Sequence, residues 1–312
     1  MERFEETPAG LGTGNGDDLV LPFQAERAGA SGRLARLGPL VDDILTRHDY
    51  PEPVSKVLGE AVTLTALLGA SLKFEGTFIL QAVTDGPVDL LVADYRTPGK
   101  LRGYARFDAE KIAALDGKAG AGPLLGKGHM AMTIDQGPET ERYQGIVPLE
   151  GGGLNEAADI YFRQSEQLPT FIRLAVARHY DGASGRQSWR AGGLLLQHLT
   201  PEGGHASQAD TDGWNRASTL AATVEDEELV DPMLPPDRLL YRLFHEEGVR
   251  AFRAAPLRTY CRCSEKRVRG LLASFSGEEL ADMVERDQIH VTCEFCNARY
   301  SFPAREYLDR RS

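Results

Sequence analysis

Long apolar runs are missing from this chain of 312 residues, and only four cysteines occur in it. No stretch approaches the ~20 consecutive apolar residues that a membrane-spanning helix needs, so we expect no membrane association. The start of the chain, Met1-Glu2-Arg3-Phe4, lacks the apolar core of a secretory signal. Thiols in a protein that is not exported stay reduced, so the sequence predicts a cytoplasmic protein without a structural disulfide framework.

An excess of positive charge is also missing. The chain has 35 Lys and Arg against 46 Asp and Glu, which gives a formal net charge of −11. A general nucleic-acid-binding protein needs a basic face to meet the phosphates, so the composition argues against nucleic acid as a main partner. The hydrophobic and charged fractions, 42% and 26%, are ordinary for a soluble globular protein, and the length has room for two domains.

Nucleotide-binding and hydrolase motifs are incomplete. The glycine-rich stretch Gly120–Gly128 resembles a phosphate-binding loop, but that pattern requires glycine where Ala121 stands and Ser or Thr where Gly128 stands. We therefore expect a flexible hairpin loop here. Ser184 has Arg186 in place of the last glycine of a nucleophile elbow. The missing nucleotide loop agrees with a binding protein that is not an enzyme.

The cysteines are concentrated near the end of the chain. They form a C-x-C pair, Cys261 and Cys263, and a C-x-x-C pair, Cys293 and Cys296. Two close pairs that a fold brings together supply four sulfurs to one tetrahedral ion, and zinc favours that geometry and soft thiolate ligands. The sequence therefore predicts one zinc ion on these four residues. His290 is a further candidate ligand, although four thiolates already complete a tetrahedron.

Basic side chains crowd the first pair: Arg258, Arg262, Lys266, Arg267 and Arg269. Nearby cations stabilise thiolate over thiol, which favours both metal binding and reaction with oxidants. Two hypotheses stay open at this point. One is a purely structural zinc knuckle. The other is a redox switch, in which each pair closes as a local disulfide and the metal is expelled; a C-x-C disulfide closes a very small ring and is expected to be readily reduced again.

The order of the predicted elements indicates an α+β fold with an N-terminal core domain of mixed sheet and helix. Residues 1–17 are rich in Gly, Glu and Thr and are expected to form a disordered leader. The core domain spans 18–200, with helices predicted near Gly38, after Pro53 and over 155–164, the last with Asn155 as N-cap. The predicted strands are 19–23, 77–83, 88–95, 101–107, 130–134, 143–147, 171–178 and 192–199. Because hairpins connect most of them, the fold class is α+β and not a doubly wound sheet.

A change in composition after Thr200 predicts a helical linker over 201–250. A weakly amphipathic helix from Trp214 to Val230 ends in like charges and is followed by prolines, so it should be only marginally stable. A second helix is predicted over 237–247. Trp214 and Tyr241 are candidate client contacts, although such aromatic residues more often serve packing.

A small zinc-binding domain is predicted over 251–312. Short helices are expected over 264–272 and 276–286. Ser276 and Glu279 have the spacing of a capping box, in which each side chain satisfies a backbone N–H of the other residue.

Several motifs resemble those of the redox-regulated 33 kDa heat-shock chaperone family. The segments 261–268 and 291–296 resemble its zinc centre. The string Tyr-Phe-Arg-Gln-Ser-Glu-Gln-Leu-Pro-Thr at 161–170 is long and unusual, and 84–87 and 192–197 add to the likeness. The resemblance extends over nearly everything after the leader.

The resemblance implies an ATP-independent holdase that binds unfolded or misfolded client proteins under oxidative stress. The reduced form would be inactive, with one zinc ion on Cys261, Cys263, Cys293 and Cys296. Oxidation would form the disulfides Cys261–Cys263 and Cys293–Cys296, release zinc and yield an active homodimer. Pairing within each motif also agrees with the low entropic cost of closing short loops. Residues 18–200 would then bind clients and dimerise, and 251–312 would be the redox switch.

Two other functions are weighed against this hypothesis. A metalloenzyme is disfavoured, because catalytic zinc keeps an open coordination position and usually has three protein ligands. A zinc ribbon that binds RNA or a protein partner draws support from the basic cluster between Arg262 and Arg269, and it predicts a salt-dependent affinity for RNA.

Overall fold

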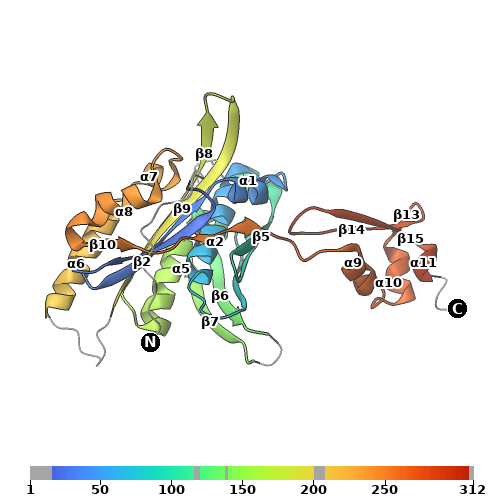
Figure 1. The fold of residues 1–312 in the computed structure, drawn as a ribbon. Coiled ribbons are helices and arrows are strands. Elements are labelled where there is room, and N and C mark those ends of the chain that lie inside the picture. The colour runs from blue at the N-terminus through green and yellow to red at the C-terminus, as the bar shows by residue number, and fades with distance from the viewer. Residues whose placement is uncertain (1–15, 116–119, 138–139, 200–207, 309–312) are drawn as a thin grey trace. The chain divides into compact units, whose positions relative to one another are not determined.

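Two units of structure follow one another along the chain. The computed structural model describes residues 16–115, 120–137, 140–199 and 208–308. Contacts divide the chain between Thr259 and Tyr260 (Figure 1). The second unit thus begins at Tyr260 and not at residue 251.

Helix α2 (Glu52–Gly69) lies at the centre of the first unit and contacts strands of both of its sheets. Its apolar side chains recur at helical spacing, and burial extends to polar residues of the helix. Ser55, Thr63 and Thr65 are buried as well, and the Thr63 hydroxyl donates a hydrogen bond of 2.8 Å to the Gly59 carbonyl. A helix between two sheets has almost no solvent face, so it reads as hydrophobic all round.

Sheet A has the strand order β10-β1-β2-β9-β8, with β11 also paired to β1. Its strands are β1 (Leu19–Ala25), β2 (Ala30–Leu37), β8 (Thr170–Asp181), β9 (Arg186–His198), β10 (Val249–Ala251) and β11 (Ala255–Pro256). Side chains alternate between its faces, as strand geometry requires. Val20 packs on the α2 side, whereas Leu21 and Phe23 pack on the opposite side. Both faces of sheet A are therefore covered.

Sheet B has the order β12-β5-β4-β3-β6-β7 and lies on the other side of α2. Its strands are β3 (Thr77–Thr84), β4 (Val88–Arg96), β5 (Lys100–Phe107), β6 (Lys127–Asp135), β7 (Tyr143–Glu150) and β12 (Arg258–Thr259). Only β12 pairs in parallel; the other pairs are antiparallel. Asp85-Gly86-Pro87, a sequence typical of turns, joins β3 and β4.

Helices α6 (Gln208–Ala222), α7 (Asp226–Val230) and α8 (Pro236–Phe244) cover the face of sheet A that points away from α2 (Figure 1). Their buried side chains are Ala217, Ala221, Leu229, Leu239, Leu240, Leu243 and Phe244, each at most 2% exposed. Phe244 stacks on Phe23 of β1 with ring centroids 5.4 Å apart. Residues 208–244 thus form a full packing layer.

The remaining helices of the first unit are short. They are α1 (Pro39–Thr46), α3 (Ala109–Ala114), α4 (Ala121–Leu125), α5 (Leu154–Tyr161), the π-helical turn η1 (Phe162–Glu166) and the 3-10 turn η2 (His245–Glu247). The π-turn falls within the family-like string at 161–170. There the Tyr161 hydroxyl donates a hydrogen bond of 2.8 Å to Glu166.

The second unit combines α9 (Glu265–Leu272), α10 (Gly277–Asp282) and α11 (Arg305–Leu308) with a small sheet of order β13-β14-β15. The strands are β13 (Val284–Glu285), β14 (Gln288–Thr292) and β15 (Arg299–Pro303). Its core is slight: Val268, Leu272, Leu280, Ile289, Phe302, Ala304 and Tyr307. The capping box of Ser276 and Glu279 is confirmed.

The α+β class is confirmed, and several local predictions need correction. Strand β2 was not predicted. The glycine-rich stretch from Gly120 begins with helix α4 and not with a hairpin loop, and Gly153, not Asn155, is the N-cap of α5. The predicted helix 214–230 is broken between α6 and α7, because residues 223–225 leave the helical conformation. The helix predicted over 276–286 ends at Asp282.

The predicted leader and the start of the predicted linker fall largely on residues 1–15 and 200–207, which lie outside the described residues. Asp17, however, forms an ion pair with Arg190 of β9. Asp18 accepts hydrogen bonds from the backbone N–H groups of Gly38 and Leu40 at the start of α1. The ordered first unit therefore includes residues at the end of the predicted leader.

Candidate metal centre

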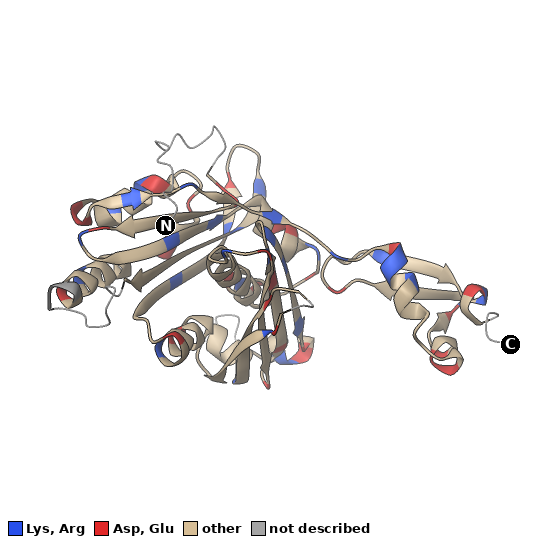
Figure 2. Cartoon of the chain, turned by 60° about the horizontal axis from the view of Figure 1, so that its bottom comes forward, with Lys and Arg blue, Asp and Glu red and all other residues tan. Residues whose placement is uncertain are grey.

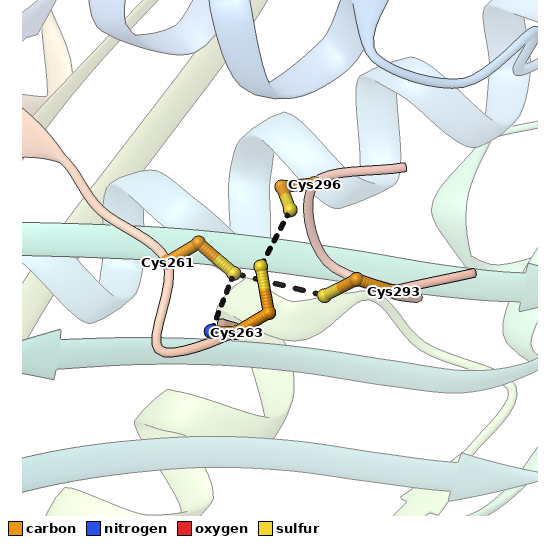
Figure 3. Close-up of side chains that lie close together, drawn as sticks. All are labelled: Cys261, Cys263, Cys293 and Cys296. Carbon is orange, nitrogen blue, oxygen red and sulfur yellow. Dashed lines mark hydrogen bonds between the residues drawn. The ribbon is translucent and has the colours of Figure 1, made fainter. Parts of the chain in front are cut away.

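The four cysteine side chains point toward one another from two separate segments (Figure 3). Their sulfur atoms all lie within 4.8 Å of one another, and this is the one such ligand cluster among the residues that the structure describes. The Sγ atoms of Cys261 and Cys293 are 3.6 Å apart, and those of Cys263 and Cys296 are 3.2 Å apart. The fold therefore brings together the two pairs that are separated in sequence.

Local structure fixes each pair. Cys261 and Cys263 lie in an irregular segment just before α9, whose N-cap Ser264 accepts a hydrogen bond from the Arg267 N–H. Cys293 and Cys296 lie in the turn between β14 and β15. There the Asn297 N–H donates to the Cys293 carbonyl at 2.8 Å, with Asn297 in the left-handed region at φ 55°. Asparagine tolerates that conformation better than most residues.

A tetrahedral zinc ion fits this donor set. Zinc–sulfur bonds of about 2.3 Å place the sulfur atoms of a tetrahedron about 3.8 Å apart. The sulfur separations of 3.6 Å and 3.2 Å are shorter than this, and all separations are within 4.8 Å. Four thiolates suit a soft or borderline ion in a closed structural site, because no coordination position is left open for substrate.

The thiols oppose one another's ionisation in the absence of a cation. Burial raises the pKa of Cys296 above its ordinary value, and hydrogen bonds with the other three thiols raise it further, whereas the backbone N–H of Ala298 lowers it. Thiolates are the metal-binding form, so binding of a divalent ion to this cluster must release protons.

Tyr300 of β15 also touches the sulfur cluster. Its hydroxyl donates a hydrogen bond of 3.3 Å to the Sγ atom of Cys263. This contact, together with burial, raises the pKa of Tyr300 to about 12, so the hydroxyl keeps its proton at neutral pH. Sequence reasoning assigned Tyr300 no role at the site. The segment 300–302 does resemble the family's zinc centre, but only the β14–β15 pairing places the Tyr300 hydroxyl against a sulfur atom.

The basic residues near the first pair are partly engaged elsewhere. Arg269 pairs with Glu265 at 2.9 Å and Glu306 at 2.7 Å, and its guanidinium lies over the Phe302 ring. Arg267 donates to the Arg262 carbonyl at 2.7 Å. Helix α9 still carries a cluster of basic residues (Figure 2). Because Arg269 is neutralised, this cluster is weaker than the sequence suggests as a surface for RNA.

His290, the alternative ligand, lies on β14 with its Nδ1 atom 2.8 Å from the Ser301 hydroxyl. It is not part of the sulfur cluster. The two candidate client aromatics lie in the first unit. Trp214 of α6 packs against His198 with ring centroids 5.8 Å apart. Tyr241 of α8 is 64% exposed, and its ring is tilted against that of His245 with centroids 5.3 Å apart.

Among the described residues, no helix has both the length and the apolar character needed to span a membrane.

Comparisons with known proteins agree with one another. A family model described as Hsp33 protein matches residues 18–303. A 33 kDa chaperonin of Caulobacter vibrioides is 50% identical over 292 residues, which cover 92% of this chain and 95% of that protein. A 33 kDa chaperonin of Ectopseudomonas mendocina is 39% identical over 291 residues, with coverage of 92% and 93%.

A solved structure supports the same assignment at the level of the fold. The crystal structure of the 33 kDa chaperonin of Thermotoga maritima superposes with a TM-score of 0.75 at 22% identity, covering 94% of this chain and 97% of that chain. The family match extends from the start of β1 to the end of β15, and the cysteine cluster and both sheets of the first unit lie within it. The chain therefore belongs to the Hsp33 family of chaperones.

Proposed function

We propose that this chain is a redox-regulated, ATP-independent holdase that binds unfolded client proteins under oxidative stress. The observation that carries the proposal is the convergence of all four cysteines in a small unit of slight hydrophobic core. Reduced protein holds one zinc ion through Cys261, Cys263, Cys293 and Cys296. When bound, zinc supplies a cross-link between the two pairs, and structural zinc typically contributes about 10–16 kcal/mol of folding free energy at neutral pH.

Oxidation removes this cross-link. Peroxide oxidises two thiols to one disulfide and is itself reduced to water, so two peroxides convert the four thiols into Cys261–Cys263 and Cys293–Cys296. A disulfide sulfur is a poor metal ligand because it carries no thiolate charge. The second unit then keeps only its small apolar core, which is too little to hold a fold of this size.

The second unit is joined to the layer over sheet A by very short strands. From α8 the chain runs through β10, β11 and β12, which pair over two or three residues each with β1 and β5. Thr259, the last residue of β12, lies two positions before Cys261. When the second unit unfolds, the chain next to β12 is no longer held, and the short pairings of β10, β11 and β12 are easily lost.

Release of α6–α8 would expose the apolar outer face of sheet A. That face carries Leu19, Leu21, Phe23, Leu34, Leu194 and Leu196, all buried in the closed structure. An apolar face of this kind suits unfolded chains, which present apolar side chains, and it also suits a second copy of the protein. We accordingly propose that the oxidised form is a homodimer and that it acts in the cytoplasm.

The test follows aggregation of a heat-denatured client by light scattering. Oxidised, zinc-free protein should suppress scattering without ATP, reduced zinc-bound protein should not, and a reductant should reverse the oxidation. A variant with all four cysteines changed to serine separates the thiols from the rest of the chain. If it responds to peroxide as the wild type does, the cysteines are not the switch.

A further inference from the structure

Arg36 of β2 is buried on the outer face of sheet A, although its charge would ordinarily hold it at the surface. Its side chain is 1% exposed. The guanidinium donates to four backbone carbonyls of the segment that follows α6: those of Glu228 at 2.9 Å and Leu229 at 3.0 Å, and those of Asp231 and Leu234. Burial and the neighbouring charge of Arg190 lower the pKa of Arg36 to about 10, so the group remains charged at neutral pH.

Arg190 of β9 extends the same arrangement. Its Nε atom donates to the Val230 carbonyl at 2.7 Å, and its other nitrogen atoms bind the Asp17 carboxylate. The two arginines together bind the carbonyls of residues 228–231 and 234, which we call the gripped segment. These are the last carbonyls of α7 and those just beyond it, which have no partner within a helix. Pro232 and Pro235 have no N–H to donate and prevent α7 from continuing, so the arginines supply donors for these carbonyls.

Gly192 of β9 allows the gripped segment to approach the sheet. A Cβ atom at this position would lie 2.1 Å from the Leu229 carbonyl oxygen and so could not be accommodated. The gripped segment therefore touches sheet A with its main chain. Leu229 also adds a fully buried side chain, 0% exposed.

The two arginines bind main-chain atoms, which every polypeptide has. We propose that Arg36, Arg190 and Gly192 form a site on sheet A that binds main-chain carbonyls, which we call the carbonyl-reading site. In the structure described here the gripped segment occupies this site in place of a client. After the gripped segment is released, an unfolded client occupies the site. The ligand class is a chain segment with unsatisfied carbonyls, such as an extended stretch or a frayed helix end, flanked by an apolar side chain. This inference rests on the proposed function and specifies its client site.

Such a site can be covered by the protein's own chain in one state and can bind clients of many sequences in the other. Guanidinium hydrogen bonds to carbonyls are charge-assisted and therefore strong, and they do not depend on client sequence. A buried arginine left without partners is costly, so the site favours an occupant in both states. Apolar neighbours such as Leu34 and Leu194 then add affinity for hydrophobic segments.

The first test measures how firmly residues 226–234 are held against sheet A in reduced, zinc-bound protein, and it needs no client. Amide hydrogen exchange of residues 226–234 is compared between wild type, Arg36→Met and Gly192→Ala. Arg173→Met is the matched control, because Arg173 contacts the same region through an exposed ion pair with Asp226 at 2.7 Å. We expect exchange to rise at least about tenfold in Arg36→Met and Gly192→Ala, and to change little in Arg173→Met. Unchanged exchange in both of the first two variants would overturn the inference.

The second test measures the client site directly. A fluorescent peptide with the sequence of residues 224–236 is titrated into oxidised protein, and its anisotropy is followed. We expect binding to wild type that Arg36→Met weakens about tenfold or more, while Arg173→Met leaves it unchanged. Equal affinity of wild type and Arg36→Met contradicts the carbonyl-reading site. If Arg36→Met does not fold, Gly192→Ala replaces it in this test, because it keeps both arginines. The affinity of Gly192→Ala for the peptide should also fall, because the added Cβ atom keeps the peptide main chain away from sheet A.

The outcomes separate this inference from the proposed function. Arg36-dependent peptide binding by an oxidised protein that fails to suppress client aggregation would refute the holdase and leave the site intact. Suppression by wild type and by Arg36→Met alike, with equal peptide affinity, would refute the site and leave the holdase intact.

Discussion

The Tyr300 hydroxyl donates a hydrogen bond of 3.3 Å to the Sγ atom of Cys263. Donation to a sulfur withdraws electron density from it and makes it a weaker nucleophile. Tyr300 comes from β15 and Cys263 from the segment before α9, so the contact exists only while the second unit is folded. We therefore expect the hydroxyl to lower the reactivity of Cys263 while the second unit is folded.

Tyr300→Phe should make Cys263 more reactive. We expect alkylation of Cys263 in zinc-bound protein, and zinc release by peroxide, to be about three- to tenfold faster, which corresponds to the ~1 kcal/mol of a typical hydrogen bond. Mass spectrometry of alkylated peptides and a chromogenic zinc chelator measure the two rates. Tyr307→Phe, in the same core but without a described sulfur contact, is the control. Equal rates for wild type and Tyr300→Phe would show that the contact has no protective role.

Serine at any one of the four cysteine positions should weaken zinc binding sharply, because a neutral hydroxyl replaces a thiolate. Loss of a group that merely supports a ligand costs about 10–100-fold in metal affinity, so we expect about 100-fold or more here. Competition with a chelator of known affinity gives the value. Full stoichiometric zinc in a Cys293→Ser/Cys296→Ser double variant would exclude this site.

The disulfides of the oxidised protein should be Cys261–Cys263 and Cys293–Cys296. The folded cluster also places Cys261 near Cys293 and Cys263 near Cys296, at 3.6 and 3.2 Å. Once the metal leaves and the unit opens, however, the short loops within each pair close at lower entropic cost. Peptide mapping under non-reducing conditions distinguishes the two patterns. A dominant Cys261–Cys293 or Cys263–Cys296 bridge would mean that oxidation precedes unfolding.

Glu60 on α2 should make the first unit less stable as pH rises. Burial, and secondarily the charge of Asp226, raise the pKa of Glu60 from 4.5 to about 7. The folded state then holds a proton that the unfolded state has lost, so the free energy of unfolding falls between about pH 4.5 and 7 and stays low above that range. Glu60→Gln should remove this slope and raise stability at pH 8 by about 1–3 kcal/mol, measured by urea denaturation. If the slope persists in Glu60→Gln, another group causes it.

Removal of the chain after Asp231 should yield a protein that suppresses client aggregation without any oxidant. The truncation deletes α8, whose Leu239, Leu240, Leu243 and Phe244 cover sheet A, and it deletes the Leu234 carbonyl that Arg36 binds. A truncation after Thr259 is the control, because it keeps α8 over the sheet; it should suppress aggregation less. If the shorter protein is inert when oxidised full-length protein is active, the second unit binds clients directly and the gating mechanism is wrong.

Local pattern was enough to predict much of this protein. The helical spacing of apolar residues from Val54 to Leu72 predicted α2, and the turn at Asp85-Gly86-Pro87 predicted the β3–β4 hairpin, because both signals lie within one element or one turn. The two close cysteine pairs predicted a four-sulfur cluster, because no other cysteines exist to compete. The helix and the hairpin depend on interactions between residues close in sequence, and the cluster depends on the only four cysteines of the chain.

Contacts between distant segments decided the rest. Strand β2 was missed because Arg33 and Arg36 interrupt its apolar alternation, and Arg36 is acceptable there only because carbonyls some 190 residues later receive its hydrogen bonds. The sequence of 201–250 predicts a marginal linker because its helices are weak on their own, whereas in the fold the apolar faces of α6, α7 and α8 are buried against sheet A. Burial of a charge and stability of a weak helix both depend on the partner that covers them, and only the tertiary structure identifies that partner.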